Sequence, residues 1–151
     1  MHRYRSTCSW QGTTAVGYDH YDRGHVVGAP PAAVTLAMSG DAAFGGDPSR
    51  LNPESLLVAA AASCQLLSFL AVAARARLDV VAYHDDAEAD MPDDDRPVRI
   101  TEIRLRPHIT ARPPATEARL RHLIQVAHRG CYIANSLRTV VTVEPSITIL
   151  D

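Results

Sequence analysis

Two cysteines in this sequence, Cys64 and Cys131, have surroundings that suggest chemistry rather than packing alone. Cys64 lies within the apolar stretch NPESLLVAAAASCQLL, and Cys131 follows sixty-seven residues later in HRGCYIANS. A single free cysteine on an apolar helix usually behaves as a small hydrophobic residue. Here Ser63 and Gln65 give Cys64 polar neighbours, and Cys131 stands at an expected helix end, where backbone carbonyls lack partners. The pair is therefore a candidate for nucleophilic or redox chemistry.

A nucleophilic cysteine must ionise, so a positively charged group is expected near Cys64. Burial raises the pKa of a thiol unless a positive group lies nearby. The sequence has no arginine within ten residues of Cys64, so the charge must come from another segment, and Arg23 in the expected turn YDRGH is the candidate. Lysine cannot serve, because all fifteen basic residues are arginines. The same fact excludes Schiff-base and P-loop lysine chemistry.

The remaining residues with chemical potential are better explained as surface groups. The seven histidines include His122 and His128, which are six positions apart on one expected helix and so lie on different faces. None of the histidines pairs with a cysteine at zinc-finger spacing, so we expect no bound metal. The acidic residues between 85 and 95 do not fit a calcium-binding loop and are expected at a solvated hairpin tip. Cys8 lies in an expected N-terminal strand with no chemical neighbour.

The composition is that of a soluble globular protein, and residues 1–151 are expected to form a single domain. Apolar residues make up 46% of the chain and charged residues 21%. The net charge of -2 gives no electrostatic reason to expect nucleic acid as a partner. No uninterrupted run of about 18 apolar residues predicts a membrane span. Three cysteines, an odd number, do not indicate a disulfide framework, so we expect a cytoplasmic protein.

The N-terminal part is expected to supply strands and one long loop. Three segments contain β-favouring residues and are separated by Gly and Pro: 4–10, 13–21 and 25–29. The loop at 39–50 is rich in Gly, Asp and Ser. Loops of this length and composition are often functional.

A long helix is predicted to begin at Pro53, with Asn52 as its N-cap, and to end near Ala76. No charged residue occurs between Glu54 and Arg75. A helix with one exposed face would show charges every few residues, so this helix is expected to be buried almost all round. A chain of this size rarely encloses such a helix alone. We expect a sheet to cover part of it and a second subunit to cover the rest.

The C-terminal half predicts two long strands, a helix and a final strand. Residues 78–91 and 98–111 are the expected strands, and the second alternates between apolar and charged residues. An amphipathic helix follows, with Thr116 as its N-cap and Gly130 as its stop. Residues 138–150 close the chain as strand material. This order of elements predicts an α+β fold with an antiparallel sheet.

Two motifs carry a resemblance to a known family. GGDPSRLNPESLLVAAAASC, which ends at Cys64, and AHRGCYIANS, which contains Cys131, resemble the OsmC/Ohr family of cysteine-based peroxidases. The resemblance implies an intertwined homodimer, with antiparallel sheets wrapped around long central helices. It also implies that Cys64 attacks a peroxide to form a sulfenic acid, which Cys131 converts to a disulfide. No bound cofactor is implied; an external dithiol of lipoyl or thioredoxin type would restore both thiols, in oxidative-stress defence.

The resemblance further implies an arginine and a glutamate in the active site. Glu54 belongs to the NPE motif itself, whereas the arginine is Arg23, with Arg50 as the other candidate. Arg23 would lower the pKa of Cys64 and hold the leaving oxygen, and Glu54 would orient its guanidinium. Glu54 and Cys64 are ten residues apart on the expected helix, about 15 Å along its axis. We therefore expect Glu54 to serve the Cys64 of the partner subunit.

Two other functions remain open from the residues alone. The chain could be a dimeric module that binds an apolar small molecule without catalysis, or a redox sensor that uses the same disulfide. Four apolar residues near the cysteine are expected to favour organic hydroperoxides over hydrogen peroxide: Leu56, Leu57, Leu67 and Phe69. Rapid oxidation of the two thiols by an organic hydroperoxide would separate a peroxidase from a binding module.

Overall fold

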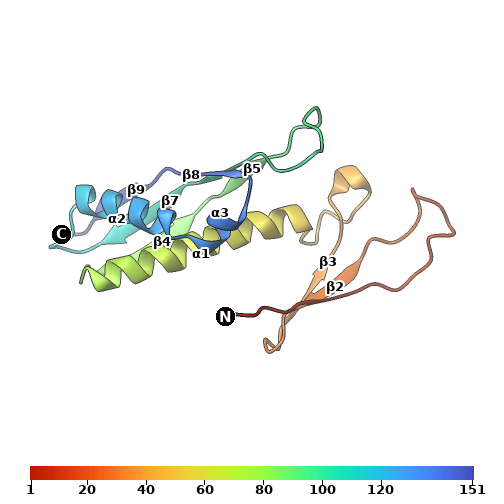
Figure 1. Ribbon diagram of the computed structural model, residues 1–151, viewed down its shortest axis with the longest axis horizontal. Coiled ribbons are helices and arrows are strands. Elements are labelled where there is room, and N and C mark those ends of the chain that lie inside the picture. The colour runs from red at the N-terminus through yellow and green to blue at the C-terminus, as the bar shows by residue number, and fades with distance from the viewer. The chain divides into compact units, whose positions relative to one another are not determined.

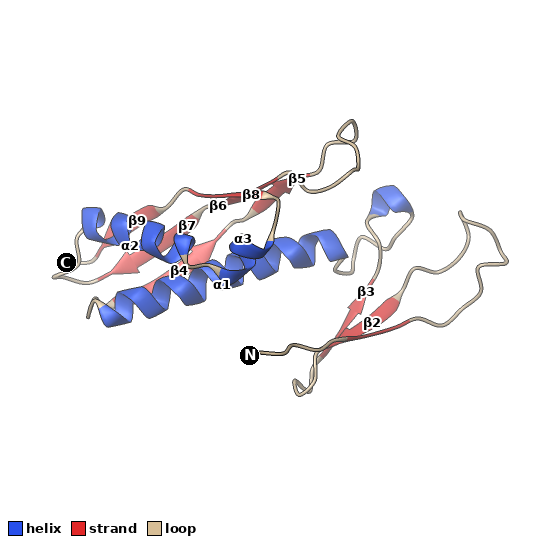
Figure 2. Ribbon diagram, in the orientation of Figure 1, coloured by secondary structure: helices blue, strands red, loops and turns tan.

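A computed structural model describes residues 1–151, which divide into two compact units, Met1–Leu57 and Val58–Asp151. Figure 1 shows the chain from its N-terminus in red to its C-terminus in blue, and Figure 2 shows its helices and strands. Each unit has its own sheet structure. The long helix α1 (Pro53–Arg75) begins in the first unit and continues in the second.

The first unit contains one small antiparallel sheet. Its three strands, in the order β1-β2-β3, are β1 (Thr7–Ser9), β2 (His25–Gly28) and β3 (Thr35–Met38). The strand predicted at 13–21 is wrong, because this segment forms turns and Gly17 adopts a φ of 93° that breaks an extended run. The Trp10 indole donates a hydrogen bond of 2.6 Å to the carbonyl of Asp22. This bond joins the two ends of the segment between β1 and β2.

Helix α1 begins where the sequence predicts. The Asn52 side chain accepts a hydrogen bond of 2.7 Å from the backbone N–H of Ser55, and Pro53 is the first helical residue. The cap satisfies one of the N–H groups that the first turn leaves without a helical partner. The side chain of Asn52 also donates 3.2 Å to Asp41, so the cap residue is fixed in turn by the preceding loop.

A single chain covers α1 only in part, and its cover by a second subunit stays a prediction. Only one narrow face is buried, at a spacing of four residues: Ala61, Gln65, Phe69 and Ala73. On the opposite side Leu67 remains 63% exposed and Leu70 38% exposed. The reason is geometric, since one sheet with one companion helix covers only a stripe of a cylinder. By length and composition alone α1 could cross a membrane, a test that the core helix of a soluble protein also passes.

The second unit contains two three-stranded sheets. The chain passes from one sheet to the other between β4 and β5 and again between β6 and β7. One sheet has the order β4-β7-β9, with β4 (Val80–Asp85), β7 (Pro107–Ala111) and β9 (Ser146–Ile149). The other has the order β5-β6-β8, with β5 (Glu88–Asp90), β6 (Glu102–Leu105) and β8 (Val140–Val143). The two long strands and the final strand predicted in this half are therefore each divided between the two sheets.

The α+β fold class is confirmed, but the prediction of purely antiparallel sheets is wrong. The hairpin pairs β4–β7 and β5–β6 are antiparallel, whereas β6–β8 and β7–β9 are parallel. The helix α2 (Glu117–Arg129) lies in sequence between β7 and β8. A helical crossover of this length lets the chain return in the same direction, which a tight turn cannot do.

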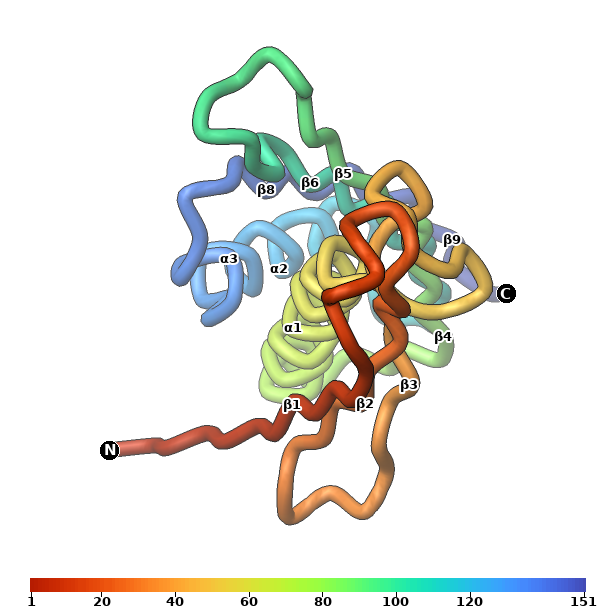
Figure 3. Tube along the Cα trace, turned by 90° about the vertical axis from the view of Figure 1, so that its right-hand side faces the viewer, coloured from red at the N-terminus to blue at the C-terminus, as the bar shows by residue number.

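Helix α2 matches its predicted caps and apolar face. The Thr116 side chain accepts a hydrogen bond of 3.3 Å from the N–H of Arg119, and the predicted residues Leu120, Leu123, Ile124 and Ala127 are buried. They pack with Phe69 of α1 and Ile109 of β7 in the core of the second unit. Figure 3 shows α1 and α2 side by side, with the short helix α3 (Tyr132–Ser136) directly after α2.

Candidate active site

The fold of the second unit brings the two predicted cysteines together. Cys64 lies in the middle of α1, and Cys131 is the N-cap residue of α3, one residue beyond the Gly130 cap of α2. The sulfur of Cys64 accepts a hydrogen bond of 3.5 Å from the backbone N–H of Ile133. The thiol of Cys131 lies within hydrogen-bonding reach of the same sulfur. Both are free thiols in this structure.

The environment of Cys64 lowers its pKa below that of an ordinary thiol. Partial burial of the sulfur acts in the opposite direction and is the largest single influence. Hydrogen bonds to the sulfur together outweigh it, because each stabilises the thiolate form. Four groups supply these bonds: the backbone amides of Ile133 and Tyr132, the thiol of Cys131 and the hydroxyl of Ser68. Within one chain, therefore, neutral donors rather than an arginine favour the thiolate.

Cys131 has the opposite tendency. Burial raises the pKa of the Cys131 thiol, and the hydrogen bond to Cys64 and the negative charge of its thiolate raise it further. Backbone amides of Ala134 and Ile133 act in the other direction but do not offset these effects. Of the two thiols, Cys64 is therefore the one that loses its proton more readily. This difference suits a nucleophile and a thiol that acts after it.

The unequal pKa values give a measurable pH profile. In a Cys8→Ser background, we expect alkylation of Cys64 by iodoacetamide to rise with pH at a midpoint below that of a free thiol, because only the thiolate reacts. Alkylation of Cys131 should stay slow across the series, because its side chain is buried and its pKa is raised. Peptide mass spectrometry across a pH series measures the midpoint for Cys64 and the extent of labelling at Cys131. A Cys64 midpoint at or above that of a free thiol would contradict the lowered pKa.

Two further residues at this site were not predicted as functional. Ser68 lies four residues after Cys64, so the helical period alone puts the two on one face of α1. Gln65 is completely buried, and its amide donates a hydrogen bond of 3.4 Å to the carbonyl of Ile124 in α2. The Gln65 oxygen has no partner. Ser68 acts on the Cys64 sulfur, whereas Gln65 links the helix that carries Cys64 to the helix that leads to Cys131.

A cavity of about 700 Å³ gives access to Cys64 but not to Cys131. Residues of α1, α2 and α3 line this cavity, with Cys64 and Arg75 on α1. Most of the lining is apolar: Leu67, Ala71, Val72, Val126, Ala127 and Ile133. Of the four residues predicted to form an apolar wall, only Leu67 lines this cavity. Phe69 is fully buried and packs its ring 6.0 Å from that of Tyr83, so it belongs to the core instead.

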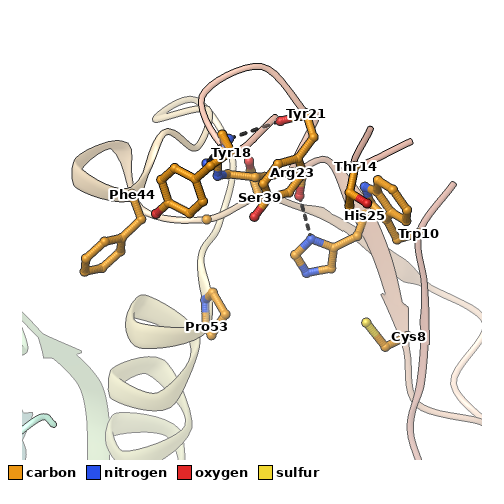
Figure 4. Close-up of a pocket in the computed structure, with 11 residues that line it drawn as sticks. Cys8, Trp10, Thr14, Tyr18, Tyr21, Arg23, His25, Ser39, Phe44 and Pro53 are labelled. Carbon is orange, nitrogen blue, oxygen red and sulfur yellow. Dashed lines mark hydrogen bonds between the residues drawn. The ribbon is translucent and has the colours of Figure 1, made fainter. Parts of the chain in front are cut away.

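The predicted arginine, Arg23, borders a separate cavity within the first unit. Its guanidinium donates to the carbonyls of Tyr21 at 3.0 Å and Tyr18 at 2.8 Å. It also lies over both tyrosine rings, 4.2 Å from the centre of Tyr21 and 5.0 Å from that of Tyr18 (Figure 4). Gly45 has a φ of 77°, and a Cβ there would lie 3.0 Å from the Arg23 Cζ. Glycine at this position therefore makes room for the guanidinium.

The cavity beside Arg23 has a volume of about 520 Å³. Aromatic side chains line much of it, together with polar residues such as His25 and Ser39. Figure 4 shows Trp10, Tyr18, Tyr21 and Phe44 around it, with Pro53 at the start of α1 on the same cavity. Cys8 also borders this cavity and is exposed. The cavity that it borders is also lined by Arg23 and His25, whereas the sequence indicated no chemical neighbour for it.

The other two predicted residues differ in what they contact. Arg50 forms an ion pair of 3.4 Å with Asp47 at the surface. Glu54 lies in the first turn of α1, and one of its carboxylate oxygens is buried without a hydrogen-bond partner. Arg23 and Glu54 form no ion pair within 4.0 Å, so the expected bidentate contact is not present in a single chain.

Comparison with known proteins shows the family. The family model for OsmC-like protein matches residues 46–146, roughly two thirds of the sequence. The chain therefore belongs to the OsmC-like family, as its two cysteine motifs predicted. No curated protein matches the chain.

Solved structures with this fold cover nearly the whole chain. An OsmC-like protein of unknown function from Vibrio cholerae has a TM-score of 0.88 and 25% identity, over 97% of this chain and 100% of that one. An organic hydroperoxide resistance protein OsmC from Legionella pneumophila has a TM-score of 0.71 and 19% identity, over 98% of each chain. An organic hydroperoxide resistance protein from Elizabethkingia anophelis has a TM-score of 0.73 and 18% identity, over 99% of this chain and 98% of that one. At these identities the last two establish the shared fold alone.

Proposed function

We propose that this protein is a thiol-dependent peroxidase that reduces organic hydroperoxides, with Cys64 as the attacking thiol and Cys131 as the resolving thiol. The observation that carries this proposal is the sulfur pair itself, in which hydrogen bonds lower the pKa of Cys64 while burial raises that of Cys131. A packing cysteine needs no such environment. Two fold relatives are named for organic hydroperoxide resistance, which agrees with this chemistry.

The reaction follows from the two thiols. The Cys64 thiolate attacks the terminal oxygen of the hydroperoxide, the O–O bond breaks, and the alkoxide leaves and takes up a proton. The Cys64 sulfenic acid then reacts with the Cys131 thiol, which forms the disulfide and releases water. An external dithiol, of lipoyl or thioredoxin type, reduces the disulfide and is itself oxidised. Leu67, Val72 and Val126 offer the apolar surface that an organic peroxide would contact.

We further propose that the active unit is a homodimer in which Arg23 and Glu54 serve the Cys64 of the partner subunit. The exposed apolar residues of α1 that lie outside the cavity beside Cys64, among them Leu70 and Ala74, support this, because such a face is normally covered. The buried, unpartnered oxygen of Glu54 also supports it, since a buried carboxylate oxygen normally has a donor. Arg23 keeps guanidinium N–H groups beyond the two that bind backbone carbonyls, and these could hold the departing alkoxide.

The first test of the proposed activity is stoichiometric. Addition of one equivalent of cumene hydroperoxide to the reduced Cys8→Ser protein should remove both remaining thiols within seconds and produce an intramolecular Cys64–Cys131 disulfide. Thiol titration and non-reducing peptide mapping measure the two outcomes. A non-catalytic binding module of the same fold would keep its thiols on this timescale. Retention of both thiols would therefore reject the peroxidase and favour the binding module.

Complementation between two inactive variants tests the role of Glu54 across the dimer. In a mixed dimer of Cys64→Ser and Glu54→Gln chains, a trans arrangement creates one site with both Cys64 and Glu54, whereas a cis arrangement creates none. Random pairing should then restore about a quarter of the wild-type activity, because half of the dimers are mixed and each has one intact site.

The same samples provide the controls for that experiment. Each variant alone should remain inactive or nearly so, and sedimentation velocity should show a dimer in all three preparations. A mixture no more active than its components, in dimers shown to have exchanged subunits, would reject the trans arrangement.

A further inference from the structure

The two sulfur atoms differ sharply in their accessibility to an incoming molecule. Cys64 lines the cavity of about 700 Å³ between α1 and α2, whereas Cys131 does not line it. The whole Cys131 residue is only 1% exposed. Both sulfurs must be re-reduced after each cycle of the proposed reaction, yet an external reductant can approach only one of them.

The backbone around Cys131 is fixed on both sides, so the residue does not turn outward easily. Its N–H donates 3.1 Å to the carbonyl of His128, and its carbonyl accepts 3.0 Å from the N–H of Asn135. The side-chain amide of Asn135 donates to the same carbonyl at 2.9 Å and to that of Arg129 at 3.0 Å. Exposure of the Cys131 sulfur would require several of these hydrogen bonds to break together.

We propose that reduction of the Cys64–Cys131 disulfide is regiospecific, and that the incoming thiolate attacks the sulfur of Cys64 and expels Cys131. In this step the new bond joins the reductant sulfur to Cys64, the Cys64–Cys131 bond breaks, and its electron pair leaves on Cys131, which then takes up a proton. The second thiol of the reductant attacks its own sulfur in the mixed disulfide and releases Cys64 as a thiolate. The reductant ends as a cyclic disulfide, so two electrons reach the protein. The inference rests on the proposed function only for the source of the disulfide.

A second subunit does not weaken this argument. A partner chain can only reduce the exposure of Cys131 further, because covering a surface never uncovers a buried atom. Cys64, in contrast, must stay reachable in any assembly that lets it meet a peroxide. The asymmetry between the two sulfurs is therefore present in the monomer and in every active oligomer.

The direction of attack also predicts that a dithiol completes the reduction better than a monothiol. After the first exchange, the Cys131 thiol lies next to the mixed disulfide on Cys64, at a high effective concentration. It can attack Cys64 again and expel a monothiol, which returns the protein to its oxidised form. A dithiol escapes this reversal, because its second thiol is also held close to the mixed disulfide. Monothiols should thus form the mixed disulfide but complete the reduction poorly.

Trapping of the mixed disulfide tests the proposal. The Cys8→Ser protein is first oxidised with diamide, so that disulfide formation does not depend on any peroxidase activity. Excess glutathione is then added, and samples are quenched in acid within seconds, unfolded and alkylated. Cleavage after arginine separates Cys64, in peptide 51–75, from Cys131, in peptide 130–138. Mass spectrometry locates the glutathione.

We expect glutathione on peptide 51–75 and the alkyl group on peptide 130–138, with a preference of at least about tenfold. The same oxidised protein unfolded in denaturant is the control and should give a mixture, because both sulfurs are then accessible. Equal labelling of the folded protein, or a preference for peptide 130–138, would overturn the proposal. The outcome is distinct from that of the proposed function, since a protein inert to peroxides could still show the preference after diamide oxidation.

Discussion

Replacement of Cys64 by serine should abolish peroxide-dependent oxidation of a dithiol, with a loss of at least about a thousandfold that leaves only the uncatalysed rate. The hydroxyl of serine is far less acidic than the thiol, and the four donors around Cys64 cannot shift its pKa into the physiological range. A coupled assay with cumene hydroperoxide and a lipoyl-type dithiol measures the loss. The structural cost should be small, because the side chain is only partly buried and serine is close in size.

The matched control for this variant is Cys8→Ser, which also removes one thiol but from an exposed strand of the first unit. It should retain most of the wild-type rate. Comparable losses in both variants would mean that thiol content in general, rather than the hydrogen-bonded sulfur of Cys64, carries the activity. Circular dichroism spectra of the two variants should match that of the wild type.

Replacement of Cys131 by serine should separate the first turnover from the following ones. One equivalent of peroxide should still react quickly, because the serine hydroxyl can replace the Cys131 thiol as a hydrogen-bond donor to Cys64. Recycling through the disulfide is impossible, so steady-state turnover with a dithiol should fall by about a hundredfold or more. Rapid mixing measures the first turnover, and intact-protein mass spectrometry should show Cys64 progressing from sulfenic to sulfinic acid.

Alanine at position 131 provides the comparison that isolates the hydrogen bond. It removes the donor as well as the resolving thiol, so the pKa of Cys64 should rise and the first turnover should slow at neutral pH. Sustained wild-type turnover by either variant would show that Cys131 does not resolve the sulfenic acid.

The sequence predicted the elements whose signals are local. Asn52 and Thr116 cap their helices as expected, and the apolar face of α2 matches its period. The parallel strand pairs were missed because no local pattern distinguishes a strand that returns through a helical crossover from one that returns through a turn. The charge-free stretch of α1 predicts that the helix is covered but not what covers it, and a single chain covers only the face that includes Phe69 and Ala73.

The site was predictable at the level of side chains but not of backbone groups. Cys64 and Cys131 could be singled out from their neighbours, and Ser68 could have been found from its spacing of four residues. The amides of Tyr132 and Ile133 could not, because every residue has an N–H group and only the fold decides where it points. The expected arginine is therefore not the only group that can favour the Cys64 thiolate, because α3 supplies backbone donors to its sulfur.

The sequence separation of the two cysteines has a consequence for the energetics of the oxidised protein. A Cys64–Cys131 disulfide would close a loop of sixty-seven residues that holds two strand pairs and all of α2. In the chain-entropy account, closing a loop of this length destabilises the unfolded chain by roughly 4 kcal/mol. By linkage, folding stabilises the disulfide by the same amount, which lowers its reduction potential by about 90 mV relative to the unfolded pair. The oxidised form should therefore be the more heat-resistant one, and only a strongly reducing dithiol should return it to the working state.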